Sequence, residues 1–167
     1  MTAANLPSLL QRFFTERLQS QLGASPHTIA SYRDTFRLLL VFASERLGRV
    51  PSKLRMEDLG TVVLCAFLDH LEHGRDNTPK TRNTRLAALR SFFHFVAFAE
   101  PACSLQCQQV LAIPTKRHER RPVEFLAEKE TAALIAAPDP ATWIGRRDRT
   151  LLLVAVQTGL RNAERRD

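Results

Sequence analysis

Residues 78–98 read TPKTRNTRLAALRSFFHFVAF, and this stretch contains a clear helical pattern. Its apolar side chains recur three and four residues apart, at Leu86, Leu89, Phe93 and Val96. That spacing places them on one face of an α-helix. Thr78-Pro79 favours a helix start, because a threonine hydroxyl can accept from a free backbone amide and proline is tolerated in the first turn.

Three further amphipathic helices are expected before this one, and strand patterns are almost absent from the chain. The first covers about Leu6–Gln21 and the second runs from Ser25-Pro26 to a break at Gly48. The third follows Met56–Asp58 and ends at Gly74–Asn77. Four helices joined by short loops predict a small bundle, and we assign residues 1–112 to it.

The chain after this bundle divides into a basic linker and a short second unit. Residues 113–124 are expected to form the linker, in which two prolines bracket several cations. Residues 125–167 begin at Phe125-Leu126 and predict a short helix at Glu128–Ala137 and an apolar helix from about Arg147 to Gln157. Thr158-Gly159 should end that helix, because glycine accepts the left-handed conformation of a helix C-cap. This second unit is too small to bury a core alone.

The charge balance favours a polyanionic partner. The chain has 24 Lys and Arg against 17 Asp and Glu, for a net charge of +7. A basic surface attracts nucleic acid first and an anionic membrane surface second. The longest apolar runs, Leu38–Ala43 and Leu151–Val156, are far shorter than the roughly 18–20 residues that cross a bilayer. We therefore expect a soluble, cytoplasmic protein with no membrane partner.

The three cysteines give no disulfide framework, which fits a reducing compartment. Cys103 and Cys107 could both touch one metal from a single helix, but a site would need two further ligands. The expectation is therefore small, buried or half-buried thiols, with no metal and no cofactor.

Two clusters of cations are candidates for contacts with double-stranded DNA. The first lies on the second and fourth helices, where cations, hydroxyls and an amide suit phosphate oxygens and base edges; its members are Arg33, Arg37, Lys80, Thr81, Arg82, Asn83, Arg85 and Arg90. The second lies in the linker and comprises Lys116, Arg117, Arg120 and Arg121. A solvated basic face and a merely soluble linker remain the structural alternatives.

The end of the chain carries a more specific pattern. An apolar helix after Arg147-Asp148-Arg149 leads to Thr158-Gly159-Leu160-Arg161, with Glu164 three residues later. Ser25-Pro26-His27-Thr28 and the Thr81–Phe93 segment add two further motifs in the same order. In these motifs the chain resembles tyrosine recombinases of the phage integrase family.

That resemblance implies a fold and a mode of binding. The fold would be all-α over these residues, with a four-helix SAM-like core-binding domain followed by the first helices of an incomplete α+β catalytic domain. The two parts would clamp a DNA duplex, and other recombinase protomers on the same site are a further partner that we leave open. DNA binding would associate the protein with the nucleoid.

The resemblance also implies a catalytic role for Arg161, the first of the family's two catalytic arginines. A guanidinium can donate two parallel hydrogen bonds to the oxygens of an attacked phosphate, and Glu164 would orient it. The family's nucleophilic tyrosine lies beyond this motif. The only tyrosine here, Tyr32, falls on an inward helix face. We therefore expect a truncated recombinase that cannot cut DNA by itself.

Three functions are compatible with this pattern. The first is a DNA-binding fragment of a site-specific integrase that serves DNA integration and recombination of a mobile element. The second is a non-enzymatic regulator that occupies recombination sites. The third, an unrelated helical transcription factor, would leave residues 158–164 without a purpose.

Overall fold

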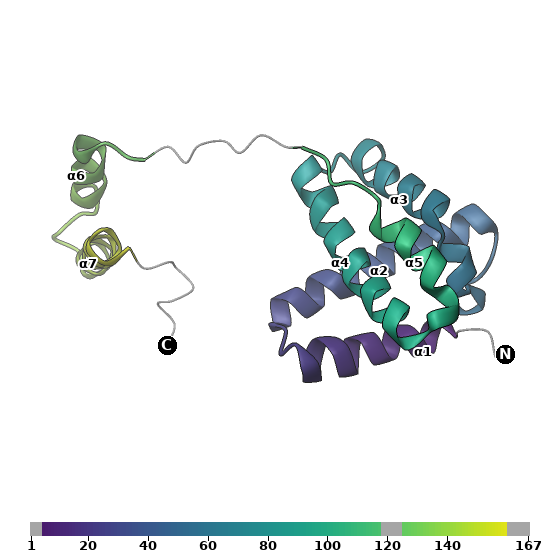
Figure 1. Ribbon diagram of the computed structural model, residues 1–167. Helices are drawn as coiled ribbons and strands as arrows, with labels where there is room; N and C mark the ends of the chain where they lie inside the picture. Colours follow the sequence, from purple (N-terminus) through teal and green to yellow (C-terminus); the bar gives the residue numbers. More distant parts are fainter. Residues whose placement is uncertain (1–4, 118–124, 160–167) are drawn as a thin grey trace. The chain divides into compact units, whose positions relative to one another are not determined.

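The computed structural model describes residues 5–117 and 125–159, and the chain divides into two compact units, residues 1–119 and 120–167. All regular elements in these described ranges are helical, which confirms the all-α prediction (Figure 1). The first unit contains α1 (Leu6–Arg12), η1 (Phe13–Gln21), α2 (Pro26–Leu47), η2 (Pro51–Lys53), η3 (Met56–Leu59), α3 (Thr61–His73), α4 (Pro79–Ala99), η4 (Pro101–Cys103) and α5 (Ser104–Leu111). The second contains α6 (Glu128–Ala136) and α7 (Trp143–Thr158).

The helix boundaries follow the capping residues that the sequence predicted. The Ser25 hydroxyl accepts a hydrogen bond from the Thr28 amide at 3.2 Å, and the Thr78 hydroxyl accepts one from the Thr81 amide at 3.2 Å. Each bond satisfies a backbone donor that has no partner inside the helix. Gly48 ends α2 with φ of +62°, a left-handed conformation that glycine adopts without a steric cost.

The predicted first helix is continuous but changes type at Phe13. Residues Leu6–Arg12 are α-helical, whereas Phe13–Gln21 form a π-helix, in which the Leu22 amide donates to the Arg17 carbonyl. The wider turn lets Phe13 and Leu18, five residues apart, both face the core, where each is at most 1% exposed.

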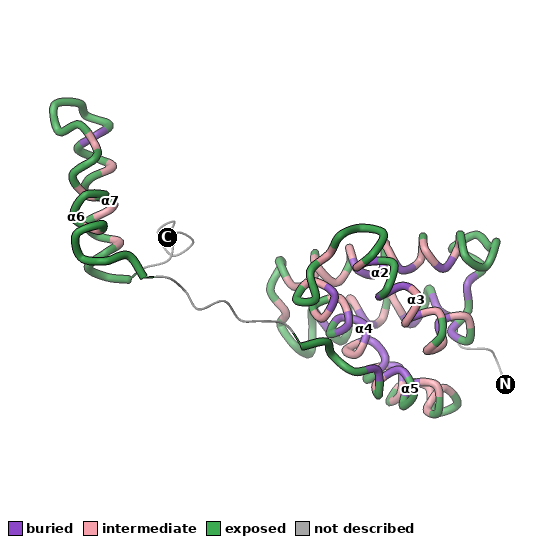
Figure 2. The backbone as a smooth tube through the Cα atoms, turned by 90° about the horizontal axis from the view of Figure 1, so that it is seen from above, coloured by how far each residue is buried: buried purple, intermediate pink, exposed green. Residues whose placement is uncertain are grey.

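The core of the first unit forms where α1, η1, α2, α3, α4 and α5 meet, and Figure 2 shows the buried positions on their inner faces. Aromatic rings lie at its centre. The Phe92 ring of α4 lies 5.4 Å from Phe13 and 5.1 Å from Phe36, both edge to face. The four apolar residues that define the inward face of α4 are all fully buried. Edge-to-face aromatic packing adds specific geometry to ordinary apolar burial.

A fifth helix of the bundle, α5, was not predicted. It packs against α4 (Figure 1) and buries Cys107 and Val110, and Gln106 donates from its side chain to the Met56 carbonyl at 2.7 Å. Its mixed sequence, SLQCQQVL, is too short for a strong periodic signal. The thiol prediction for Cys103 and Cys107 is confirmed: the first is half-buried and the second buried, and both are free.

The described part of the second unit, residues 125–159, is a helix pair without an apolar core of its own. Between residues 125 and 159 the only buried residue is Gly145, and Figure 2 shows this stretch almost entirely as exposed or intermediate. On α7 several apolar side chains are 37–58% exposed: Ile144, Leu151, Leu153, Val154 and Val156. Gly159 ends α7 with φ of +64°, as predicted. None of the described helices combines the length and apolar composition of a membrane span.

Candidate nucleic-acid interface

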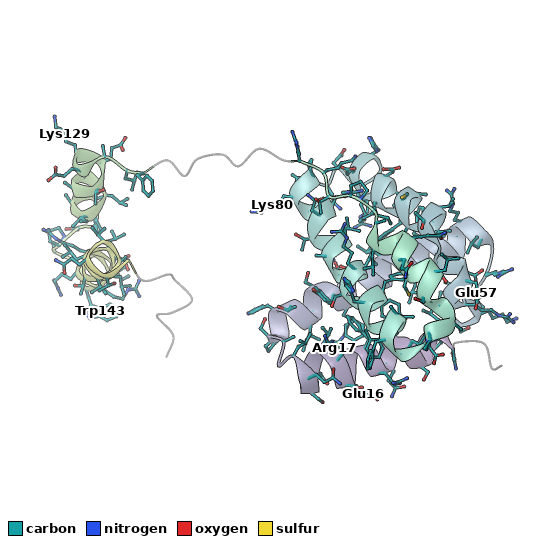
Figure 3. The ribbon with its side chains drawn as sticks, in the orientation of Figure 1. Glu16, Arg17, Glu57, Lys80, Lys129 and Trp143 are labelled. Atoms are coloured by element: carbon teal, nitrogen blue, oxygen red, sulfur yellow. The ribbon has the colours of Figure 1, made fainter. Side chains whose placement is uncertain are left out.

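The start of α4 presents one of its predicted cations to solvent. Thr78 caps the helix, and Lys80 in its first turn is exposed; Figure 3 labels it at this end of α4. Thr84, four residues after Lys80, and Ala87, three residues after Thr84, are also exposed. A helix N-terminus adds unpaired amides and a favourable dipole for phosphate. Thr81 is half-buried, with its hydroxyl 3.1 Å from that of Thr78.

Arg82 lies inside the first unit, contrary to its predicted position at a DNA surface. Its side chain is 6% exposed, and its guanidinium donates to the Pro114 carbonyl at 3.0 Å. The Arg82 Nε also lies 4.0 Å from a carboxylate oxygen of Glu72. The helical spacing by itself predicts that Arg82 faces the core, because Arg82 precedes the buried Leu86 and Leu89 by four and seven residues.

Asn83 contacts the linker through both of its amide atoms. Its Nδ2 donates to the Lys116 carbonyl at 2.7 Å, and its Oδ1 accepts from the Lys116 amide at 3.0 Å. The Lys116 ammonium lies 2.5 Å from Glu72 of α3, whose side chain is 11% exposed. The predicted linker residues up to Lys116 are therefore held on the bundle.

Arg85 joins α4 to α2. Its guanidinium donates to Asp34 at 2.6 Å, to the Thr35 hydroxyl at 3.0 Å and to the Ser31 carbonyl at 3.1 Å. Its side chain is 18% exposed, so it serves the bundle rather than presenting a free cation.

Arg90 also faces its own chain. It is half-buried and donates to the Ile113 carbonyl, at the point where the chain leaves α5. Three of the four predicted arginine and lysine contacts on α4 are thus engaged in intramolecular bonds. No sequence rule identifies the acceptors, since they lie 23 to 54 residues away.

The two predicted cations of α2 are exposed to solvent, unlike the three arginines of α4. Arg33 is exposed, and the Arg37 side chain is 76% exposed, with only a distant pair to Asp34 at 3.8 Å. Asp34, the α2 residue that accepts from Arg85 of α4, lies between these two cations in the sequence. Arg117, the last described residue of the first unit, is exposed as well.

Four predicted site residues lie outside the described residues. Arg120 and Arg121 belong to the linker, and Arg161 and Glu164 belong to the predicted catalytic motif. Their assignments stay predictions.

Tyr32 packs where the sequence placed it, on the inward side of α2. Its ring is stacked on that of Phe13, with centroids 6.4 Å apart and an interplanar angle of 9°. The side chain is partly buried against the core cluster. Its position supports a packing role.

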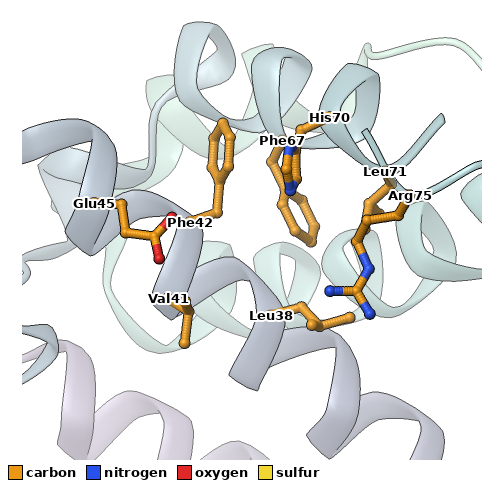
Figure 4. A pocket seen from close by; sticks show the side chains of 8 residues that line it. All are labelled: Leu38, Val41, Phe42, Glu45, Phe67, His70, Leu71 and Arg75. Carbon is orange, nitrogen blue, oxygen red and sulfur yellow. The ribbon is translucent and has the colours of Figure 1, made fainter. Parts of the chain in front are cut away.

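Two hollows in the first unit lie apart from these cations. A cavity of about 180 Å³ lies between α2 and α3, and Figure 4 shows the side chains around it: Leu38, Val41, Phe42, Glu45, Phe67, His70, Leu71 and Arg75. It is smaller than typical small-molecule sites of roughly 300–1,000 Å³. A groove between η1 and α4 contains Arg12 and Arg17, but Arg12 pairs with Glu16 and Arg17 donates to Gln21. Neither hollow offers a free cluster of cations.

Comparison with known proteins assigns this architecture to a family. Residues 10–99 match the model of the phage integrase N-terminal SAM-like domain. The chain belongs to the phage integrase family of tyrosine recombinases. The match spans η1, α2, α3 and α4, which carry most of the core and the exposed cations Arg33, Arg37 and Lys80.

Individual relatives of this recombinase family extend the match beyond the first unit. The chain is 54% identical over 161 residues to the putative integrase/recombinase y4rC of Sinorhizobium fredii, covering 96% of this chain and 48% of that protein. It is 50% identical over 159 residues to y4rD of the same organism, covering 95% and 57%. It is 33% identical over 153 residues to the tyrosine recombinase XerC of Rhodospirillum centenum, covering 88% and 43%.

The chain therefore spans about half the length of the curated relatives it matches. No solved structure matches it.

Proposed function

We propose that this chain binds duplex DNA as the core-binding part of a site-specific recombinase, in the service of DNA integration and recombination. The observation that carries the proposal is that three cations of α2 and α4 stay exposed while others on the same helices are bonded within the bundle. Arg33, Arg37 and Lys80 are exposed, whereas Arg85, which joins α4 to α2, is 18% exposed. Exposed cations on helices that pack together, one of them at a helix N-terminus, suit the phosphates of a duplex.

The linker extends this surface. Arg117 is exposed directly after the segment held on α4, and Arg120 and Arg121 follow in the sequence. A protein that neutralises several phosphates releases counterions, so its affinity falls steeply with salt. Association with the nucleoid would follow from this binding.

Salt-dependent DNA binding tests the proposal. The triple variant Arg33→Gln, Arg37→Gln, Lys80→Gln should bind a labelled duplex more weakly. The slope of log K against log salt should shrink by about 2–3 if all three side chains touch phosphates. Fluorescence anisotropy at several salt concentrations measures both quantities.

A charge-matched control separates this surface from net charge. The triple variant Arg46→Gln, Lys53→Gln, Arg55→Gln removes three exposed cations from the far end of α2 and the segment after it. It should leave the slope within about 0.5 of the parent value. Equal losses in the two triple variants would refute the assignment of a DNA-binding face.

We further propose that residues 125–159 are the beginning of a catalytic domain and that the chain by itself does not cleave DNA. Tyr32, the sole tyrosine, is stacked on Phe13 and partly buried against the core of the first unit. A covalent nucleophile needs its helpers within hydrogen-bond reach. Incubation with supercoiled DNA that carries a cognate site should produce no nicks, and a phosphotyrosyl adduct would contradict this.

The same packing of Tyr32 favours a second role, in which the chain occupies recombination sites as a non-enzymatic regulator. An excess of this chain should then reduce recombination by a full-length relative on a shared site. The triple variant at Arg33, Arg37 and Lys80 should inhibit less. Unchanged recombination at saturating occupancy of the site would exclude the regulatory role.

A further inference from the structure

The first residues of the linker are bound along one edge of α4. Arg90 donates to the Ile113 carbonyl, and Arg82 donates to the Pro114 carbonyl at 3.0 Å. Asn83 both donates to and accepts from the backbone of Lys116, at 2.7 and 3.0 Å. We call these three side chains, together with Glu72 of α3, the linker seat.

The contacts from α4 all go to backbone atoms. A segment without a partner strand or helix would otherwise have to satisfy its carbonyls with water. The two arginines of the seat cap successive carbonyls, and the asparagine amide reproduces the paired donor and acceptor of a neighbouring strand. The seat therefore binds residues 113–116, which form no helix, through their backbone.

Glu72 adds an electrostatic contact to this backbone recognition. It lies 2.5 Å from the Lys116 ammonium and 4.0 Å from Arg82 Nε, and its side chain is 11% exposed. A largely buried carboxylate between two cations ties the linker to α3 as well as to α4. It pairs with the Lys116 ammonium, which is 46% exposed, and the next cation along the chain, Arg117, is exposed as well.

We propose that the linker seat positions the basic linker for DNA, and that Arg82, Asn83 and Arg90 act on DNA through the linker rather than by touching it. This proposal rests on the proposed DNA-binding function. Asn83 follows Lys80 by one helical turn and holds Lys116, so the seat starts the linker cations beside the cation at the α4 N-terminus. Ordering residues 113–116 before binding removes part of the entropic cost of association.

The seat can be tested without DNA, by limited trypsin digestion of the full chain. For trypsin to cut after Lys116, the backbone must leave the bundle and the lysine side chain must be free to enter the specificity pocket of the protease. The seat binds both groups, the backbone through Asn83 and the ammonium through Glu72. Asn83→Ala should speed cleavage after Lys116 by about tenfold, since it removes two hydrogen bonds. Mass spectrometry of the early fragments measures this rate.

A control and a graded variant complete the digestion experiment. Thr84→Ala lies next to Asn83, is exposed, and loses only a bond to the Lys80 carbonyl of its own helix. It should leave the rate unchanged. Asn83→Asp keeps the acceptor and loses the donor, so its rate should fall between those of the parent and Asn83→Ala. Equal rates at Lys116 in all folded variants, as judged by circular dichroism, would overturn the seat.

A double-mutant cycle on DNA affinity tests the positioning role. The linker-neutral variant replaces Arg117, Arg120 and Arg121 with glutamine. Asn83→Ala should weaken binding about threefold in the parent and less than about 1.5-fold in the linker-neutral variant, because coupled sites are not additive. Equal losses in both would mean that Asn83 touches DNA directly, which would overturn the positioning role.

The two experiments separate the two proposals. A parent chain that does not bind the duplex would refute the proposed function and the positioning role together. The digestion rates would still decide whether the linker seat exists.

Discussion

Replacing Arg85 with alanine, and Arg37 separately, distinguishes a cation that holds the bundle from one that faces DNA. Both arginines lie near the same carboxylate, Asp34, and both were predicted to contact DNA. Arg85 reaches Asp34 at 2.6 Å and is 18% exposed, whereas Arg37 lies 3.8 Å away and is 76% exposed. Alanine at position 85 should therefore lower the stability of the first unit, whereas alanine at position 37 should weaken DNA binding.

The expected loss of stability at Arg85 follows from its three hydrogen bonds. Bonds to charged groups contribute about 1.5–3 kcal/mol each when well formed, and the 42% exposure of Asp34 reduces this value. Arg85→Ala should destabilise the first unit by about 2 kcal/mol, or roughly 8 °C in Tm for a unit of this size. Arg37→Ala should cost at most about 0.5 kcal/mol, because exposed ion pairs contribute little.

DNA binding should show the reverse order. Arg37→Ala should reduce the slope of log K against log salt by about 0.9, the value for one phosphate contact, whereas Arg85→Ala should leave it unchanged. Thermal unfolding by circular dichroism and anisotropy titrations below the unfolding temperature measure the two effects. An Arg85→Ala variant that melts like the parent but loses a phosphate contact would refute the division of these cations.

Three further outcomes follow from the first unit. Gly48→Ala should lower the free energy of unfolding in urea by about 1 kcal/mol, because Gly48 has φ of +62°. Gly60 has an extended backbone, and a Cβ added there would meet no atom nearer than 3.9 Å, so Gly60→Ala should lower it by less than about 0.5 kcal/mol. Equal losses would contradict the left-handed cap. Burial raises the pKa of the Cys107 thiol to about 11, so little reactive thiolate exists at pH 8. Iodoacetamide should therefore label Cys107 rapidly only after unfolding in urea, which peptide mass spectrometry measures. Rapid labelling of the native chain would refute this prediction. Phe92→Ala should lower the free energy of unfolding by about 3–5 kcal/mol in the same urea experiment, because Phe92 is fully buried. Phe98 is 89% exposed, so Phe98→Ala should leave the free energy of unfolding nearly unchanged. Similar losses in the two variants would mean that the core is misassigned.

The helices of the first unit could be predicted from local physics. Ser25 and Thr78 cap helices wherever a short hydroxyl side chain precedes a periodic apolar run, and both are found at those ends. The inward face of α4 follows from a spacing of three and four residues. The same register also places Arg82 on the buried side, so a stricter use of periodicity predicts its burial. The helix α5 was missed because eight residues give too weak a period.

The partners of the charged side chains were decided by tertiary structure alone. Arg85 meets Asp34 across 51 residues of chain, and Asn83 meets Lys116 across 33. A helical pattern determines which side of its own helix a residue occupies, but the neighbour on that side depends on how separate helices dock. Composition therefore predicted a basic chain with a nucleic-acid partner. The packing of the helices determines which cations stay exposed, namely Arg33, Arg37 and Lys80. It also determines which form intramolecular hydrogen bonds, namely Arg82, Arg85 and Arg90. The physical reason is that a polar group buried by packing is costly unless it finds a hydrogen-bond partner.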